Sequence, residues 1–347
     1  MKWLKWPLFP FAFIFWLITS IRNGLFDKKF IKPTSFSIPI ISVGNITMGG
    51  TGKTPHTEYL IRLLNPKFEI AILSKGYGRK TKDFRYVSSN NIPNEVGDEP
   101  LQIKNKFCET IIAVDHNRVN GVLSILNDFP KLDGIVLDDA FQHRKINPGF
   151  SILLSDFNNP FHKDFIFPLG YLRESRHHSS RADVLIVSKC PKNLTTNQAD
   201  NLKKEISFNG DVFFSTIIYG DIYHIFNKSK LELNKTKNLV LVTGIAYPDE
   251  LVKHIKSHNI NFKHLNFRDH YPYKEKDASE IIEIFDNFVD NDKIILTTQK
   301  DAEKLKLFKS FEKYPLYCID IKIDFIWDKN KFDKKIHDYV IHHQINS

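Results

Sequence analysis

Gly49-Gly50-Thr51-Gly52-Lys53-Thr54 decides the fold of this chain, because it follows the short apolar run Pro39-Ile40-Ile41-Ser42-Val43. A buried strand, a glycine-rich turn and Gly-Lys-Thr in this order are typical of a phosphate cradle. Backbone N–H groups of such a loop point at nucleotide phosphates, Lys53 reaches the terminal phosphates, and the Thr54 hydroxyl is placed for Mg²⁺. The strict spacing of this motif calls for a glycine at position 47, where this chain has Thr47. A glycine-rich surface turn is the plainer alternative. The residues predicted to hold the nucleotide are Thr47, Gly49, Gly50, Thr51, Gly52, Lys53 and Thr54.

A second stretch, Gly134-Ile135-Val136-Leu137-Asp138-Asp139, predicts a core strand that ends in two carboxylates. Carboxylates at the tip of a strand beside the glycine loop can hold Mg²⁺ or the waters around it. Apolar strands also end in Asp for reasons of turn geometry, so the pattern alone is weak. Together with the glycine loop, it indicates a P-loop fold.

Length, charge and cysteine content limit the class of protein. With 347 residues, 42% of them hydrophobic and 26% charged, the chain predicts an ordered protein of two domains. The excess of 49 Lys and Arg over 40 Asp and Glu suits an anionic partner, which is a nucleic acid, an anionic membrane or a phosphorylated ligand. The three cysteines stand apart in the sequence, which argues against a zinc site or a disulfide framework and fits a reducing cytosol.

The N-terminal segment favours the membrane among these partners. The sixteen residues from Trp6 to Ile21 carry no charge, are rich in Phe, and lie between Lys5 and Arg22. This length is short for a spanning helix, and two prolines shorten its helical part further. The small-residue cleavage site of a signal peptide is missing. We predict an aromatic-rich helix in the membrane interface, with a buried core helix as the alternative.

Short apolar runs alternate with helical stretches along the rest of the chain. The alternation predicts an α/β fold with a P-loop NTPase-type, doubly wound, mainly parallel sheet and a second, smaller α/β domain. Two apolar runs meet at Gly220-Asp221 and predict a hairpin between the domains. We therefore expect an N-terminal membrane-associating helix (1–35), a P-loop domain (36–210), a two-stranded hairpin linker (211–230) and a C-terminal α/β domain (231–347).

Polar residues follow other predicted strands, where a doubly wound sheet builds its site. Val96-Gly97-Asp98-Glu99-Pro100 places two carboxylates in a loop, and Phe267-Arg268-Asp269-His270-Tyr271 places a histidine after a strand of the second domain. An Asp–His pair across the cleft would make a general base able to take a hydroxyl proton near neutral pH. Each segment alone is equally typical of a surface turn.

Three further clusters predict contacts to an anionic sugar or phosphate. Lys75, Tyr77 and Arg79 share one glycine-containing loop, and Gln142 and His143 follow the two aspartates. Arg173-Glu174 comes after a turn at Pro168, and the two side chains can serve phosphate and metal or simply pair with each other. The clustering of these groups at strand ends predicts a phosphoryl-transfer cleft.

Together these motifs resemble the tetraacyldisaccharide 4′-kinase family of membrane-associated lipid A kinases. The resemblance runs in order across nearly the whole chain, including the N-terminal apolar helix. It rests on Val43 to Pro55, Gly76-Tyr77-Gly78, Val96 to Pro100, Asp138 to His143, Pro168 to Glu174, Asp269-His270 and Lys300-Asp301-Ala302.

The resemblance implies that residues 36–210 form a kinase domain, which transfers the γ-phosphate of ATP to the 4′-hydroxyl of a tetraacylated glucosamine disaccharide 1-phosphate. This reaction is a late step of lipid A biosynthesis. The resemblance also implies that the protein lies at the cytoplasmic face of the bacterial inner membrane. The roles carried over are Asp98, His270 and Lys53 in catalysis, Thr54, Asp138, Asp139 and Glu174 at Mg²⁺, and Lys75, Tyr77, Arg79, Gln142, His143 and Arg173 at the substrate.

Two other P-loop classes compete with this interpretation: a membrane-associated GTPase and an ATP-driven switch without small-molecule phosphotransfer. Guanine recognition usually needs an N-K-x-D-like element, and neither 188–191 nor 299–301 fits it. The positioning ATPases carry an extra Lys where Met48 stands. No nucleic-acid recognition motif is visible. We therefore expect a lipid substrate and an anionic membrane surface as partners, with no nucleic acid and no obligate protein partner.

Overall fold

The computed structural model describes residues 7–345, so Lys5 and Trp6, at the start of the predicted apolar segment, lie outside the described residues. The strands are β1 (Ile40–Asn45), β2 (Ile70–Ser74), β3 (Arg85–Tyr86), β4 (Ile111–Val114), β5 (Gly134–Asp138), β6 (Phe150–Asp156), β7 (Val184–Ser188), β8 (Asp211–His224), β9 (Lys230–Leu231), β10 (Asn238–Thr243), β11 (Asn261–Asn266), β12 (Lys293–Thr298) and β13 (Leu316–Phe325). The helices are α1 (Phe9–Asp27), α2 (Lys53–Leu64), α3 (Pro93–Val96), α4 (Asp98–Lys106), α5 (Arg118–Asp128), α6 (Thr196–Ile206), α7 (Asp249–Lys256), α8 (Glu275–Asp286), α9 (Gln299–Leu305) and α10 (Lys329–Ile345).

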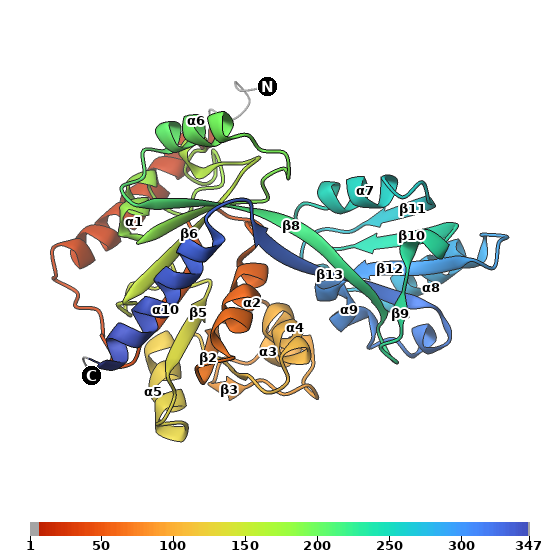
Figure 1. Cartoon of the computed structure of the whole chain (residues 1–347), viewed down its shortest axis with the longest axis horizontal. Helices are drawn as coiled ribbons and strands as arrows, with labels where there is room; N and C mark the ends of the chain where they lie inside the picture. Colours follow the sequence, from red (N-terminus) through yellow and green to blue (C-terminus); the bar gives the residue numbers. More distant parts are fainter. Residues whose placement is uncertain (1–6, 346–347) are drawn as a thin grey trace.

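The strands form one sheet in the order β11-β10-β12-β13-β8-β7-β6-β1-β5-β2-β4-β3, with β9 paired to β8. Strands β7, β6, β1, β5, β2 and β4 are parallel to one another, and so are β11, β10, β12 and β13. Figure 1 shows two lobes, an N-terminal unit with β1–β7 and a C-terminal unit with β10–β12, with β8 and β13 running between them. The predicted α/β class with a second, smaller unit is confirmed.

Helices cover both faces of the N-terminal unit. On one face α2, α4 and α10 pack on the sheet, and on the other face α5 and α6 contribute to separate apolar clusters. All residues of β1, β2, β5, β6 and β7 are buried, as expected for parallel strands covered on both sides. The glycine loop follows β1, which lies between β5 and β6, so the carboxyl ends of these strands meet where such folds bind ligands.

The predicted hairpin turn at Gly220-Asp221 is wrong. Residues 211–224 form the single strand β8, whose first residues pair with β7 and whose later residues pair antiparallel with β13. The register shifts between Ile319 and Ile321, opposite Gly220. Glycine therefore marks a β-bulge here and not a turn, because a bulge also interrupts the regular pairing of a strand.

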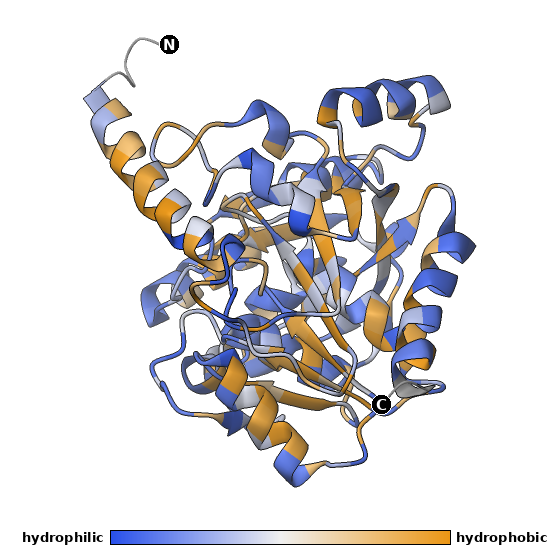
Figure 2. Ribbon diagram, turned by 90° about the vertical axis from the view of Figure 1, so that its left-hand side faces the viewer, coloured by the Kyte–Doolittle hydropathy of each residue, from blue (hydrophilic) through white to orange (hydrophobic). Residues whose placement is uncertain are grey.

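The predicted N-terminal helix is present as α1, and most of its apolar residues face outward. Phe11 and Ile18 are each more than 60% exposed, whereas Ala12, Asn23 and Phe26 are buried. Among the described helices, α1 is the one whose length and composition would allow it to cross a membrane. Figure 2 shows apolar residues along most of its length. Polar contacts fasten its C-terminal end to the fold, since Arg144 donates to the Asn23 carbonyl (2.8 Å) and pairs with Asp27 (2.7 Å).

The last helix does not belong to the C-terminal unit, which corrects the predicted 231–347 domain. Phe332, Ile336 and Val340 are buried in the cluster that also holds the apolar residues of β1, β6 and α2. The Phe332 ring lies 5.2 Å from that of Phe213, and the Tyr339 hydroxyl bonds to the Ile40 backbone. The spacing of four residues places these side chains on one helix face. β13 therefore returns the chain to the N-terminal unit (Figure 1).

This packing predicts that Phe332→Ala destabilises the N-terminal unit. Removing a fully buried aromatic ring leaves a cavity and costs roughly 3–5 kcal/mol of unfolding free energy. Lys334→Ala, on the exposed face of the same helix, should change it by less than about 0.5 kcal/mol. Urea unfolding followed by circular dichroism compares the two variants, and equal stabilities would contradict the assignment of α10 to this unit.

Candidate active site

The predicted phosphate loop is built from the end of β1 and the start of α2. Gly52 is the N-cap of α2, and Lys53 is its first residue. Asn45, the last residue of β1, donates to the Thr51 hydroxyl (2.9 Å), and its amide oxygen lies 3.4 Å from Lys53 Nζ. Thr54 is half-buried in the same first turn. The loop therefore presents a helix N-terminus and a cation at one point, which together favour an anion.

A segment of the C-terminal unit covers this loop. Gly49 has a φ of +107°, and a Cβ there would lie 3.3 Å from the Tyr247 hydroxyl, while a Cβ at Gly50 would meet Ala246 at 3.7 Å. The Tyr247 ring is also 4.7 Å from the Lys189 ammonium. Nothing in the sequence indicated Tyr247, because this approach depends on how the two units meet.

Asp138 and Asp139 end β5 beside the loop, as predicted. Asp138 is buried and accepts a hydrogen bond from Thr57 (3.1 Å). Burial and the neighbouring Asp139 charge raise the pKa of Asp138 to about 6, although Lys53 opposes them. Asp139 lies 3.6 Å from Lys53 and 3.2 Å from Arg173, and these cations outweigh burial and lower its pKa. The two carboxylates thus lie side by side at the end of β5, with Lys53 and Arg173 next to Asp139.

Glu174, predicted at Mg²⁺, has its carboxylate surrounded by protein donors, and its metal role stays a prediction. Its Oε1 accepts from Gln142 (2.8 Å), and its Oε2 accepts from Asn23 of α1 (2.9 Å) and from Arg181 (2.8 Å). Burial disfavours its charge, but His178 and Arg181 more than compensate and lower the pKa of Glu174. With both oxygens occupied, Glu174 fastens α1 to the Gln142 segment.

Asp98 and His270, predicted to pair across the cleft, are in contact. His270 Nδ1 lies 3.1 Å from Asp98 Oδ2, although the residues are 172 positions apart. Burial raises the pKa of Asp98, but its contacts with His270 and Lys304 outweigh burial and lower it. His270 has a φ of 55°, an uncommon backbone conformation that tends to occur at functional sites.

Gly97 sets the position of Asp98 at the start of α4. Its φ is +95°, and a Cβ there would lie 2.8 Å from Gly76 Cα, so the 74–79 loop and the N-terminus of α4 pack backbone to backbone. The Tyr77 ring from that loop lies 4.8 Å from the His270 ring and is largely exposed. Tyr77 is therefore free to contact a substrate near His270.

The other predicted substrate residues are of two kinds, and Arg79 differs from the rest because its guanidinium is hydrogen-bonded within its own loop. Lys75 is exposed, and Arg173 and Gln142 border Asp139, with Arg173 3.4 Å from the Gln142 Oε1. His143 is half-buried, and burial together with nearby cations lowers its pKa to about 4. Arg79 is instead used within its own loop, because its guanidinium donates to the carbonyls of Lys75 (3.1 Å) and Asp83 (2.7 Å). The predicted substrate contact of Arg79 is therefore corrected.

Arg118 is a buried residue of the site that the sequence did not indicate. Its side chain is fully buried and donates to the carbonyls of Asp115 (2.6 Å) and Asp138 (3.3 Å). Burial lowers its pKa to about 10. In the sequence, a role for Arg118 was indicated only by its place shortly after Asp115, which follows the parallel strand β4.

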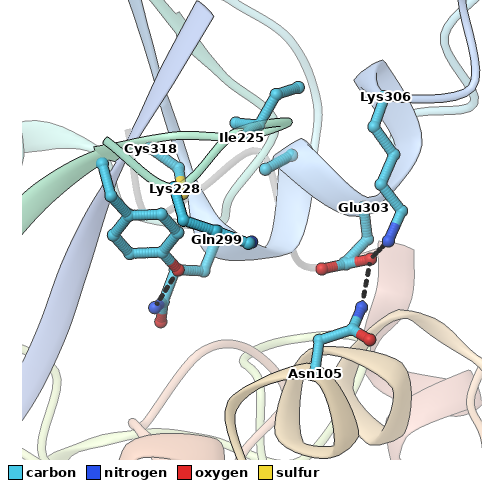
Figure 3. Close-up of a pocket in the computed structure, with 9 residues that line it drawn as sticks. Asn105, Ile225, Lys228, Gln299, Glu303, Lys306 and Cys318 are labelled. Carbon is cyan, nitrogen blue, oxygen red and sulfur yellow. Dashed lines mark hydrogen bonds and ion pairs between the residues drawn. The ribbon is translucent and has the colours of Figure 1, made fainter. Parts of the chain in front are cut away.

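A cavity of about 220 Å³ lies away from the phosphate loop, between α4, α9 and β8. Figure 3 shows Asn105 of α4 reaching Glu303 of α9, which also binds Lys306. Gln299 donates to the Tyr223 hydroxyl (2.8 Å). These residues join the two units and contain none of the predicted site residues. The cavity therefore belongs to the contact between the units.

Comparisons with known proteins identify the family of this chain. The sequence model of the family described as tetraacyldisaccharide-1-P 4′-kinase matches residues 4–341. The chain is 43% identical to the tetraacyldisaccharide 4′-kinase of Flavobacterium johnsoniae, over 98% of both chains, and 39% identical to that of Phocaeicola vulgatus, over 99% and 97%. Its fold is similar to the crystal structure of LpxK from Aquifex aeolicus in complex with ATP, with a TM-score of 0.76, 27% identity and coverage of 97% and 99%.

The family match extends over nearly the whole chain, and these relatives exceed 30% identity along nearly their full length. The chain therefore belongs to the tetraacyldisaccharide-1-P 4′-kinase family and is a kinase of lipid A biosynthesis.

Proposed function

We propose that the phosphate loop, the two aspartates and the Asp98–His270 pair together transfer the γ-phosphoryl group of ATP to the 4′-hydroxyl of a tetraacylated glucosamine disaccharide 1-phosphate. The contact between Asp98 and His270 carries this proposal, because it adds a candidate base for an acceptor hydroxyl to a site already suited to phosphates. A nucleotide switch that transfers phosphate only to water has no need of a base placed for a sugar hydroxyl.

The phosphate loop binds the nucleotide in this proposal. Backbone N–H groups at the start of α2 contact the phosphates, and the Lys53 ammonium stabilises the negative charge on the phosphoryl group that is transferred. In the resting structure Lys53 lies beside Asp139, so an arriving phosphate competes for its ammonium. Arg173, on the other side of Asp139, supplies a second cation at the same place.

Asp138, Asp139 and the Thr54 hydroxyl fit Mg²⁺. Among the described residues no three acidic, histidine or cysteine side chains gather as a metal site. Mg²⁺ in nucleotide sites needs fewer protein ligands, since one or two carboxylates, phosphate oxygens and waters complete its coordination. Burial first and the Asp139 charge second raise the pKa of Asp138, and a bound cation would favour its ionised form. When bound, Mg²⁺ would neutralise charge on the phosphates.

The Asp98–His270 pair lies at the start of α4, which packs against α2, the helix that begins at the phosphate loop. Asp98 orients the imidazole of His270, and the pair takes the proton of the acceptor hydroxyl. Because His270 belongs to the C-terminal unit, both units are needed for the chemistry.

α1 brings the enzyme to its lipid substrate. Its apolar surface continues into an exposed loop, where Phe167 contacts Phe15 (ring centroids 5.8 Å apart) and Phe165 and Tyr171 are more than half exposed. The Tyr171 carbonyl accepts from Met48 N–H (2.7 Å), so this apolar surface reaches the phosphate loop. We place the helix in the interface of the inner membrane, at the cytoplasmic face where ATP is available.

Lys53→Ala should nearly abolish product formation while the protein stays folded. The substitution removes the cation that balances the transferring charge and leaves the apolar core untouched. The assay combines purified protein, ATP, Mg²⁺ and acylated disaccharide 1-phosphate, with mass spectrometry for the bisphosphorylated lipid. A folded Lys53→Ala protein with wild-type kcat would rule out the phosphate-loop role, and no product from the wild type would rule out the proposed reaction.

Deletion of residues 1–21 should release the protein from membranes. The truncation removes most of the outward-facing apolar residues of α1 but keeps Asn23 and Phe26, which are buried against the fold. Sedimentation with anionic vesicles should fall sharply, whereas ATP affinity should stay within about twofold, because the nucleotide does not meet the helix. Val289→Ser, a control at a 99% exposed apolar residue of the C-terminal unit, should sediment like the wild type. Unchanged sedimentation of the truncated protein would place the anchor elsewhere.

A further inference from the structure

Two lysines of α9 surround the Asp98–His270 pair. Lys300 and Lys304 are four residues apart, so they share one helix face, which packs against α4. Lys304 Nζ lies 2.7 Å from Asp98 Oδ2. Lys300 Nζ lies 2.9 Å from His270 Nε2, 3.2 Å from Glu99 Oε1 and 2.9 Å from Asp269 Oδ1. Their side chains are only 15% and 11% exposed, which is unusual for lysine.

The residue between them fixes the position of α9. Asp301 is fully buried, and its Oδ2 accepts from the Thr298 hydroxyl (2.7 Å) and from Gly244 N–H (2.8 Å). The Gly244 carbonyl in turn accepts from His270 N–H (3.2 Å). The Lys300-Asp301-Ala302 motif therefore connects the start of α9 to the backbone that carries His270.

These contacts determine where the imidazole proton lies. An ammonium group can only donate, so His270 Nε2 accepts from Lys300 and the ring is neutral. The proton must then be on Nδ1, where it is donated to Asp98 Oδ2. Glu99 Oε1, 3.4 Å from Nε2, would favour a proton on that nitrogen, but Lys300 lies within 3.2 Å of the same oxygen and neutralises it.

We propose that Lys300 and Lys304 are positioning residues, which hold His270 in the neutral Nδ1–H form facing Asp98 and keep Asp98 ionised. Their contribution to turnover rests on the proposed function, but the form of the imidazole does not. Without the two cations, the His270 ring would face the carboxylates of Asp98 and Glu99 on α4, beside the neutral Tyr77 ring, while Asp269 accepts from the His270 backbone N–H. Carboxylates next to the ring favour the imidazolium, which cannot accept a proton.

The first test reads the imidazole directly and needs no substrate. The full-length protein with ¹⁵N-labelled histidine is studied by long-range ¹H–¹⁵N NMR at pH 7.5, and His270→Gln identifies the His270 signals. The wild type should show the neutral Nδ1–H form, and Lys300→Met should shift the signals to imidazolium or Nε2–H. Lys306→Met is the matched control, because Lys306 directly follows α9 as its C-cap but pairs with Glu303 (Figure 3). An Nε2–H form in the wild type, or an unchanged spectrum in Lys300→Met, overturns the proposal.

The second test separates positioning from nucleotide binding. Lys300→Met should lower kcat by at least about tenfold while KM for ATP stays within about twofold, and Lys300→Arg, which keeps the charge, should recover much of the loss. Equal losses in Lys300→Met and Lys306→Met overturn the proposal. Absence of product from the wild type would contradict the proposed reaction alone, since the NMR result is independent of it.

Discussion

The pairing of β8 with two different strands is the constraint on which the candidate site depends. Its first residues extend the parallel sheet of the N-terminal unit, and its later residues pair with β13, which itself lies beside β12. At about 3.3 Å per residue the fourteen residues of β8 span roughly 45 Å, enough to serve both units. Because a paired strand is stiff, it holds the carboxyl ends of both sets of parallel strands within reach of each other. Asp98 and His270 meet there.

The charges of the site are balanced only when the two units are together. Asp139 has Lys53 and Arg173 as partners within the N-terminal unit, and the buried Arg118 lies near both Asp138 and Asp139. Asp98 and Glu99 have their cations on α9 of the C-terminal unit. Buried carboxylates are costly without partners, so their electrostatic energy favours the closed arrangement. The same contacts that hold the units together thus prepare the groups that handle the acceptor proton.

Much of this arrangement could be predicted from local sequence. Apolar runs marked the parallel strands, and Gly52-Lys53-Thr54 and Asp138-Asp139 marked two neighbouring strand ends, because each signal lies within a few residues. The pairing of Asp98 with His270 came from the resemblance to a family, since 172 residues separate them. The bulge at Gly220, the return of α10, the tie between Glu174 and α1, and the lysines of α9 depend on register and on contacts between distant segments. Periodicity and local motifs contain no information about such contacts.

A double-mutant cycle on Asp98→Asn and His270→Gln tests the central claim most directly, namely that these side chains from different units act as one base. Kinetics of both single variants and the double variant are measured on the same lipid substrate with saturating ATP. If the pair is one unit, each single substitution lowers kcat strongly, and the double variant is scarcely slower than the slower single variant. Losses that multiply would contradict the account, because they would assign independent roles to the two residues.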